Sequence, residues 1–157
     1  MASTILELLR GFGARVSEDA DAVSVERGRL RGMDIDASQI PDLVPALGVV
    51  AACAEGSTTI HGAARLRYKE SDRLASVAAM LGALGAEVRE RPDGLLIRGG
   101  GLHGGSVRTQ GDHRIAMAAA LAACAADGPV LIDDGDCVRK SWPGFWRARE
   151  ELGGGLR

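Results

Sequence analysis

The sequence is poor in aromatic residues, in cysteine and in long apolar runs. Phe, Trp and Tyr make up 3% of the 157 residues, so the core has to be built from Ala, Leu, Val and Ile. Three cysteines do not form a disulfide framework in a chain of this length, which favours a reducing compartment such as the cytoplasm. The longest apolar stretch, 115–126, is too short to span a bilayer. We therefore expect a soluble, cytoplasmic protein without a membrane partner.

The chain also lacks an excess of charge of one sign. It has 19 basic and 21 acidic residues, a net charge of −2, and so no overall basic field that nucleic acid would require. We expect no nucleic-acid partner, and any anion-binding site must be local. Apolar residues make up 46% and charged residues 25%, which is typical of a globular domain and excludes intrinsic disorder.

What the sequence does contain is an internal repeat. Three segments of the first half recur in the second at a separation of 71 or 72 residues: 9–16 in 81–88, 44–53 in 115–124, and 57–60 in 129–132. A constant separation of this kind is the mark of a duplicated unit. We therefore predict one copy over 1–68 and a second over 69–141, followed by a C-terminal helix over 142–151.

Each copy predicts the same order of elements, namely an amphipathic helix, three short strands, an apolar helix and a last strand. The ranges are 4–12, 14–17, 22–26, 31–36, 41–54 and 57–61 in the first copy, and 71–84, 87–90, 95–98, 105–109, 113–126 and 130–133 in the second. The apolar helices have no polar stripe, so we expect them to be buried on all sides. The fold class is α/β with buried helices.

Polar clusters interrupt this apolar pattern at equivalent places in the two copies. They lie at 39–42, at 65–73, at 111–114 and at 139–141. Asp42 and His113 both stand at the start of an apolar helix, and Lys69 and Lys140 both follow the last strand of a copy. Because equivalent ends of repeated units face the same side, we expect these four residues to share one surface.

That surface suits an anionic ligand. The N-termini of buried helices offer free N–H groups and a partial positive charge. Arg73 and Arg114 can hold a carboxylate or phosphate by paired hydrogen bonds, and the two lysines add compact charges. Asp42 and Glu70, placed among cations, can act as general base and general acid.

Taken singly, each group has a simpler interpretation. Asp42 alone is a charge at a helix N-terminus, 69–73 a solvated helix start, His113 and Arg114 a capping pair, and Lys140 a surface lysine. The sequence shows neither metal-ligand spacing nor the strand-to-helix context of a nucleotide-binding glycine loop, so we expect no metal and no cofactor. Only the joint placement of the clusters favours a site.

Four motifs, in order along the chain, resemble those of the 5-enolpyruvylshikimate-3-phosphate (EPSP) synthase family. They read Ile-Pro-Asp at 40–42, Leu-Arg-Tyr-Lys-Glu-Ser-Asp-Arg-Leu at 66–74, Asp-His-Arg-Ile-Ala-Met at 112–117 and Lys-Ser-Trp-Pro-Gly-Phe at 140–145. The resemblance covers nearly the whole chain. One departure is Arg65, which stands near a position where many members have a small polar residue, often Asn.

The resemblance implies an inside-out α/β domain of the enolpyruvyl transferase type. Members of the family have two similar domains, each of three βαβαββ units, with buried helices that point their N-termini into the cleft between the domains. By this resemblance, 1–157 is a C-terminal domain fragment with about two of the three units. The first copy also enters at its helix, so we expect an earlier strand and the N-terminal domain to be missing.

The resemblance also implies an activity. The family transfers the enolpyruvyl group of phosphoenolpyruvate to the 5-hydroxyl of shikimate 3-phosphate, in the shikimate pathway to chorismate and the aromatic amino acids. The implied roles are catalytic for Asp42, Glu70, His113 and Lys140; shikimate 3-phosphate binding for Asp42 and Lys69; and phosphoenolpyruvate binding for Arg73, Arg114 and Lys140.

Three other functions stay open. One is a fragment of an enolpyruvyl transferase that acts on a UDP-sugar, although that branch differs at the motifs 69–73 and 112–114. Another is a non-catalytic anion-binding module that retains part of the site, and the last is a purely structural fragment. Because the other domain supplies further substrate contacts, we expect this chain alone to be inactive.

Overall fold

The two segments predicted as copies have the same order of helices and strands, and the first has one further 3₁₀ turn before its apolar helix. The structure, a computed structural model, describes residues 2–153, with side chains from residue 4 onward. The first copy contains α1 (Ala2–Phe12), β1 (Arg15–Glu18), β2 (Val23–Glu26), β3 (Asp34–Asp36), the 3₁₀ turn η1 (Pro41–Leu43), α2 (Val44–Ala52), β4 (Ser57–His61) and the 3₁₀ turn η2 (Ala64–Tyr68). The second contains α3 (Arg73–Ala83), β5 (Glu87–Arg91), β6 (Gly94–Arg98), β7 (Gly105–Val107), α4 (His113–Ala123), β8 (Val130–Ile132) and the 3₁₀ turn η3 (Gly135–Lys140), before α5 (Phe145–Glu151).

The expected helices and strands are present, with ends that differ by a few residues. The helix expected over 41–54 begins as 3₁₀ helix at Pro41 and becomes α-helical at Val44. The final helix starts at Phe145, two residues after a proline. The turns η2 and η3 were not expected; each is anchored by a buried apolar side chain, Leu66 in η2 and Val138 in η3.

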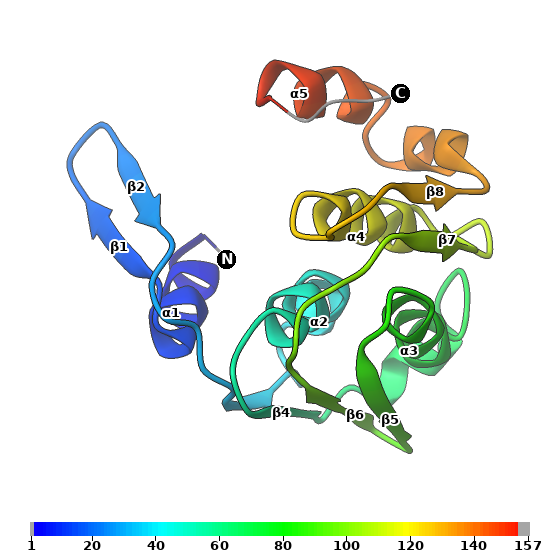
Figure 1. The fold of residues 1–157 in the computed structure, drawn as a ribbon, viewed down its shortest axis with the longest axis horizontal. Coiled ribbons are helices and arrows are strands. Elements are labelled where there is room, and N and C mark those ends of the chain that lie inside the picture. Colours follow the sequence, from blue (N-terminus) through cyan, green and yellow to red (C-terminus); the bar gives the residue numbers. More distant parts are fainter. Residues whose placement is uncertain (1, 154–157) are drawn as a thin grey trace.

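The two copies share one sheet. Within residues 2–153 the strands form a four-stranded sheet in the order β3-β4-β6-β5 and two two-stranded sheets, β1-β2 and β7-β8 (Figure 1). The pairs β3–β4 and β7–β8 are equivalent in the two copies, and both are parallel. The antiparallel pair β4–β6, with Ile60 opposite Leu95, joins one copy to the other.

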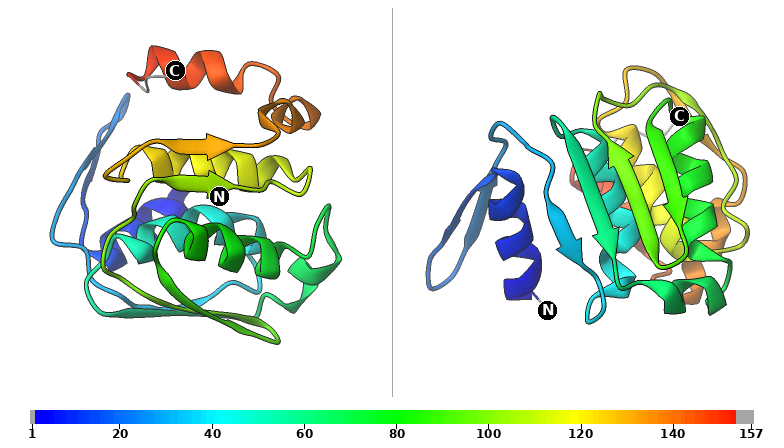
Figure 2. Two further views of the ribbon diagram at one scale, coloured as in Figure 1. Left: turned by 45° about the vertical axis from the view of Figure 1, so that its right-hand side comes forward. Right: turned by 90° about the horizontal axis from the view of Figure 1, so that it is seen from below.

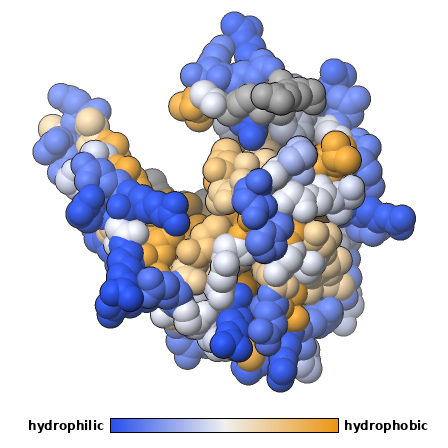
Figure 3. Space-filling view, in the orientation of Figure 1, coloured by the Kyte–Doolittle hydropathy of each residue, from blue (hydrophilic) through white to orange (hydrophobic). Residues whose placement is uncertain are grey.

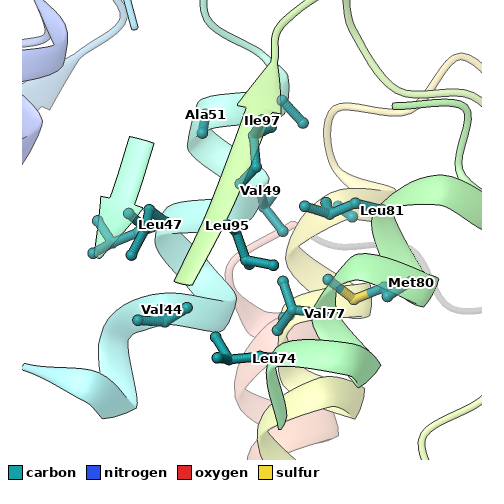
Figure 4. Close-up of a cluster of buried hydrophobic side chains, with 14 of the residues drawn as sticks. Val44, Leu47, Val49, Ala51, Leu74, Val77, Met80, Leu81, Leu95 and Ile97 are labelled. Atoms are coloured by element: carbon teal, nitrogen blue, oxygen red, sulfur yellow. The ribbon is translucent and has the colours of Figure 1, made fainter. Parts of the chain in front are cut away.

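The central helices α2 and α3 lie between two of the sheets. The four-stranded sheet covers one side of α2 and α3, and β7 and β8 lie on the other side, next to α3 and α4 (Figures 1 and 2). Side chains of α2, α3 and β6 form the core, with Val77 and Leu81 facing Leu95 and Ile97 (Figure 4). A Cβ at Gly48 of α2 would lie 3.2 Å from Val77, so glycine lets α3 approach α2 closely.

One of the two apolar helices is exposed along one face. α2 is buried, but Leu121 of α4 is 43% exposed. Leu121 lines an apolar groove of about 430 Å³ between α2, α4 and α5, together with Pro45, Met117 and Phe145. The expectation that both apolar helices are buried on all sides is therefore wrong for α4. The neighbouring helix on this face is α5, and α5 leaves the groove open.

Apolar side chains also line the hollow between the β1–β2 hairpin and the rest of the molecule (Figure 3). Val23 and Val25 of β2 are 55% and 49% exposed. Within residues 2–153, every helix falls short of the length and apolarity needed to cross a bilayer.

Candidate active site

The starts of three helices come together, and for α2 and α4 the equivalence of the two predicted copies led us to expect this. Asp42 lies in η1 directly before α2, Arg73 is the first residue of α3, and His113 is the first residue of α4. Aspartates cap two of these helices: Asp72 accepts a hydrogen bond from the Ala75 amide at 3.1 Å, and Asp112 accepts one from the Arg114 amide at 2.9 Å. Capping of this kind fixes the direction in which each helix begins.

Arg73 binds three carboxylates from different parts of the chain. Its side chain is 1% exposed. Nη1 donates to Asp42 at 3.0 Å, Nη2 donates to Glu70 at 2.5 Å, and Nε and Nη2 donate to the two oxygens of Asp112 at 2.9 and 3.1 Å. A buried guanidinium keeps its charge and needs such partners. Asp42, Glu70, Arg73, Asp112 and Arg114 are called the ion cluster below.

Asp112 is a residue of this site that the sequence analysis did not single out. It is 0% exposed and accepts a further hydrogen bond from the Ser71 hydroxyl at 3.0 Å. Burial acts to raise the pKa of Asp112, but hydrogen bonds from Arg73 and from the Arg114 amide outweigh burial and lower it. Its position in the sequence, directly before a His-Arg pair at the start of an apolar helix, could have identified Asp112 as a site residue.

Asp42 bridges two arginines. One carboxylate oxygen accepts from Arg73 Nη1, and the other lies 3.3 Å from Arg114 Nη2. The Asp42 side chain is 44% exposed and that of Arg114 is 39% exposed. The Arg114 guanidinium also lies 3.5 Å from the Asp42 backbone carbonyl. Unlike Asp112, this carboxylate is open to solvent.

Glu70 lies between Arg73 and His113. Its side chain is 40% exposed, and its second oxygen is 3.8 Å from His113 Nδ1, which is beyond hydrogen-bond distance. His113 Nδ1 is buried and has no hydrogen-bond partner among the described residues. A small movement of Glu70 would pair these two groups.

The two lysines lie around the ion cluster without joining it. Lys140 donates to the carbonyl of Gly111 at 3.0 Å, in the turn that leads into α4. Gly111 has a φ of 67°, a conformation that glycine adopts without strain. Lys69 is exposed at the end of η2, next to Glu70. Arg65 donates to the carbonyl of Ser38 at 2.6 Å and so ties η2 to the segment before η1.

The arrangement combines anion binding with proton transfer. Guanidinium and ammonium groups at helix N-termini bind carboxylate or phosphate. Two half-exposed carboxylates, Asp42 and Glu70, stand among them and can move protons. Five of the seven residues singled out in the sequence, Asp42, Glu70, Arg73, His113 and Arg114, contact or closely approach one another, and Lys140 lies beside the start of α4.

A sequence model of the family described as EPSP synthase (3-phosphoshikimate 1-carboxyvinyltransferase) matches residues 1–148. The chain belongs to this family. Curated relatives named 3-phosphoshikimate 1-carboxyvinyltransferase agree with that assignment. The one from Methanocella arvoryzae is 50% identical over 153 residues, and one from Clostridium perfringens is 47% identical over 154. They cover 96% and 97% of this chain, which spans about 36% of the length of each relative.

Solved structures confirm the enolpyruvyl transferase fold. An EPSP synthase from Acinetobacter baumannii superposes with a TM-score of 0.83 at 32% identity, over 97% of this chain and 38% of that one. The enolpyruvyl transferase NikO from Streptomyces tendae superposes with a TM-score of 0.79 at 25% identity, over 99% of this chain and 36% of that one. The α/β fold class expected from the sequence is therefore correct.

Proposed function

We propose that this chain is the C-terminal domain fragment of an EPSP synthase, which transfers the enolpyruvyl group of phosphoenolpyruvate to the 5-hydroxyl of shikimate 3-phosphate. The observation that carries the proposal is the set of hydrogen bonds from Arg73 to Asp42, Glu70 and Asp112. They join the starts of α2, α3 and α4 in a chain of this family. The two copies are 1–68 and 69–141, and the helix 142–151 follows them.

The cations of the site bind the two anionic substrates. Arg73, Arg114 and Lys140 bind phosphoenolpyruvate, and Lys69 together with Asp42 contacts shikimate 3-phosphate. In support, Arg114 lies in the first turn of α4 and Lys140 of η3 donates to Gly111 in the turn before it, where the helix N-terminus adds to the attraction for an anion. Positioning both substrates in this way removes much of the entropic cost of a bimolecular reaction.

Asp42 and Glu70 carry the protons of the addition step. The 5-hydroxyl oxygen forms a bond to C2 of phosphoenolpyruvate while its proton passes to Asp42, and Glu70 protonates the methylene carbon. In the elimination that follows, the bond from C2 to the phosphate oxygen breaks, phosphate leaves with the proton that Asp42 took up, the methyl carbon returns a proton to Glu70, and the double bond re-forms. His113, 3.8 Å from Glu70, lines this site, and Lys140 shares in proton transfer.

The rest of the enzyme covers the apolar surfaces that this chain leaves open. The groove between α2, α4 and α5 and the exposed valines of β2 support this. Strand edges without a neighbour support it too. β4 of the first copy pairs with β6 of the second. The equivalent strands, β8 of the second copy and β2 of the first, each have one neighbour among the described strands. We place the enzyme in the cytoplasm, where its three free cysteines stay reduced.

The test is release of phosphate from phosphoenolpyruvate and shikimate 3-phosphate. We expect turnover when the chain is combined with the N-terminal polypeptide of a close relative, and none from the chain alone. In the active combination, Glu70→Gln should lower kcat by roughly 100-fold, because it removes a general acid. The matched control is Glu87→Gln, on an exposed carboxylate of β5, which should leave kcat unchanged.

Other results would assign another function. Binding of shikimate 3-phosphate without turnover in the combined protein would indicate an anion-binding module. Turnover with a UDP-sugar in place of shikimate 3-phosphate would correct the acceptor, a point that the fold alone leaves open because NikO shares it. Substantial turnover by the chain alone would contradict the need for the rest of the enzyme.

A further inference from the structure

We propose that the Asp42 carboxylate is an internal anion, which competes with the carboxylate of phosphoenolpyruvate for Arg73 and Arg114. Binding of this substrate then releases Asp42 from both guanidiniums. The inference rests on the proposed function and adds an order of events to it: the proton acceptor becomes available only when the second substrate is in place.

The geometry around Asp42 is that of a bound carboxylate. Its two oxygens are divided between the two arginines, with one at 3.0 Å from Arg73 Nη1 and the other at 3.3 Å from Arg114 Nη2. The two guanidiniums are therefore spaced to accept one carboxylate group between them. A substrate carboxylate of the same size and charge fits the same pair of donors.

Burial separates the exchangeable partner of Arg73 from the permanent one. Asp112 is 0% exposed and accepts hydrogen bonds from Arg73, from Ser71 and from the Arg114 amide, so it cannot leave without exposing a buried charge pair. Asp42 is 44% exposed, and water can solvate its carboxylate as soon as the arginines release it. The pair of Asp42 with Arg114, in which both side chains are partly exposed, is of the weak, solvent-screened kind.

The charges of the site favour exchange over simple addition. Two guanidiniums, Arg73 and Arg114, already face three carboxylates, Asp42, Glu70 and Asp112. Arg73 alone already contacts all three carboxylates. A further carboxylate beside them would meet repulsion, whereas one that replaces Asp42 leaves the charge on the two arginines balanced. The lone pairs of Asp42 that the arginines engage then become free to accept a hydroxyl proton.

The experiment compares ligand affinity in the 157-residue chain and its variants by calorimetry. The variants are Asp42→Asn and Asp42→Ser, which both remove the competing charge, and Asp21→Asn, which removes an exposed carboxylate in the β1–β2 turn. The probes are phosphoenolpyruvate and pyruvate, which share a carboxylate, and inorganic phosphate. Urea unfolding of each variant checks that it is folded.

We expect both Asp42 variants to bind phosphoenolpyruvate and pyruvate roughly fivefold more tightly than the wild type, and Asp21→Asn to bind them unchanged. Equal or weaker binding by the Asp42 variants, with the wild type binding, would overturn the inference and leave the proposed function standing. Tighter binding of phosphate alone would overturn it too. If no probe binds to any of the folded proteins, the proposed anion site itself is wrong.

Discussion

Each of the two copies brings one aspartate to Arg73, and the two aspartates are held in opposite ways. Asp112, from the second copy, is fully buried and forms hydrogen bonds with three residues. Asp42, from the first copy, is about half-exposed and bridges Arg73 to Arg114. The comparison teaches that two ion pairs on one guanidinium can have different roles. The buried Asp112 fixes the position of Arg73, whereas the exposed Asp42 can be replaced by another anion.

The largest effect in this comparison is expected at Asp112. Asp112→Asn removes the one fully buried carboxylate of the three that pair with Arg73, and breaking a buried pair in this way costs about 3 kcal/mol of unfolding free energy. Urea unfolding at pH 7 measures the loss, with Asp42→Asn as the matched variant on the same arginine. A loss at Asp112 no larger than that at Asp42 would erase the distinction between the two carboxylates.

The same distinction should appear as a dependence on pH. In an unfolded chain an aspartate has a pKa of about 3.9. Burial acts to raise the pKa of Asp112 in the folded protein, but hydrogen bonds from Arg73 and the Arg114 amide lower it. The stabilisation by ionised Asp112 is therefore complete above about pH 4 and is lost as the pH falls through the lowered pKa.

We therefore expect the stability gap between the wild type and Asp112→Asn to be constant from pH 7 to pH 5 and to shrink below about pH 4. Urea unfolding of both proteins across this range is the measurement. Asp36→Asn is an exposed variant for comparison: the Ser38 amide lowers the pKa of Asp36 too, so its stability gap should also shrink as the pH falls. A gap that stays constant down to pH 2 would show that the charge of Asp112 is not what stabilises the fold.

Much of the fold and of the site could be predicted from the sequence, because duplication carries geometric information. The separation of 71 residues between Asp42 and His113 placed both at helix starts, and the structure brings them to the same place through Glu70 and Arg73. The order of helices and strands followed from the same repeat and from hydrophobic periodicity.

What the sequence could not predict depends on contacts between distant side chains. Nothing in the spacing of Arg73 and Asp112, 39 residues apart, shows that they form a buried pair. The exposed face of α4 was also missed, because an apolar helix looks the same whether or not a neighbour covers Leu121. The 3₁₀ turns η2 and η3 were also missed, because each is too short to show a hydrophobic period: the buried side chains are Leu66 in η2 and Cys137 and Val138 in η3.

The smallest expected effect concerns the pair of Asp42 and Arg114, the exposed side of the comparison between Asp42 and Asp112. A double-mutant cycle with Asp42→Asn and Arg114→Gln should give a coupling free energy of about 0.2–1 kcal/mol, because both side chains are partly exposed and 3.3 Å apart. The coupling should fall further at about 1 M salt, where the Debye length is near 3 Å. The matched cycle with Asp112→Asn and Arg73→Gln should give a larger coupling that salt barely changes, since water and ions do not reach that pair. A coupling for Asp42 as large and as salt-resistant as that of Asp112 would mean that Asp42 is as firmly held, and an anion could not displace it.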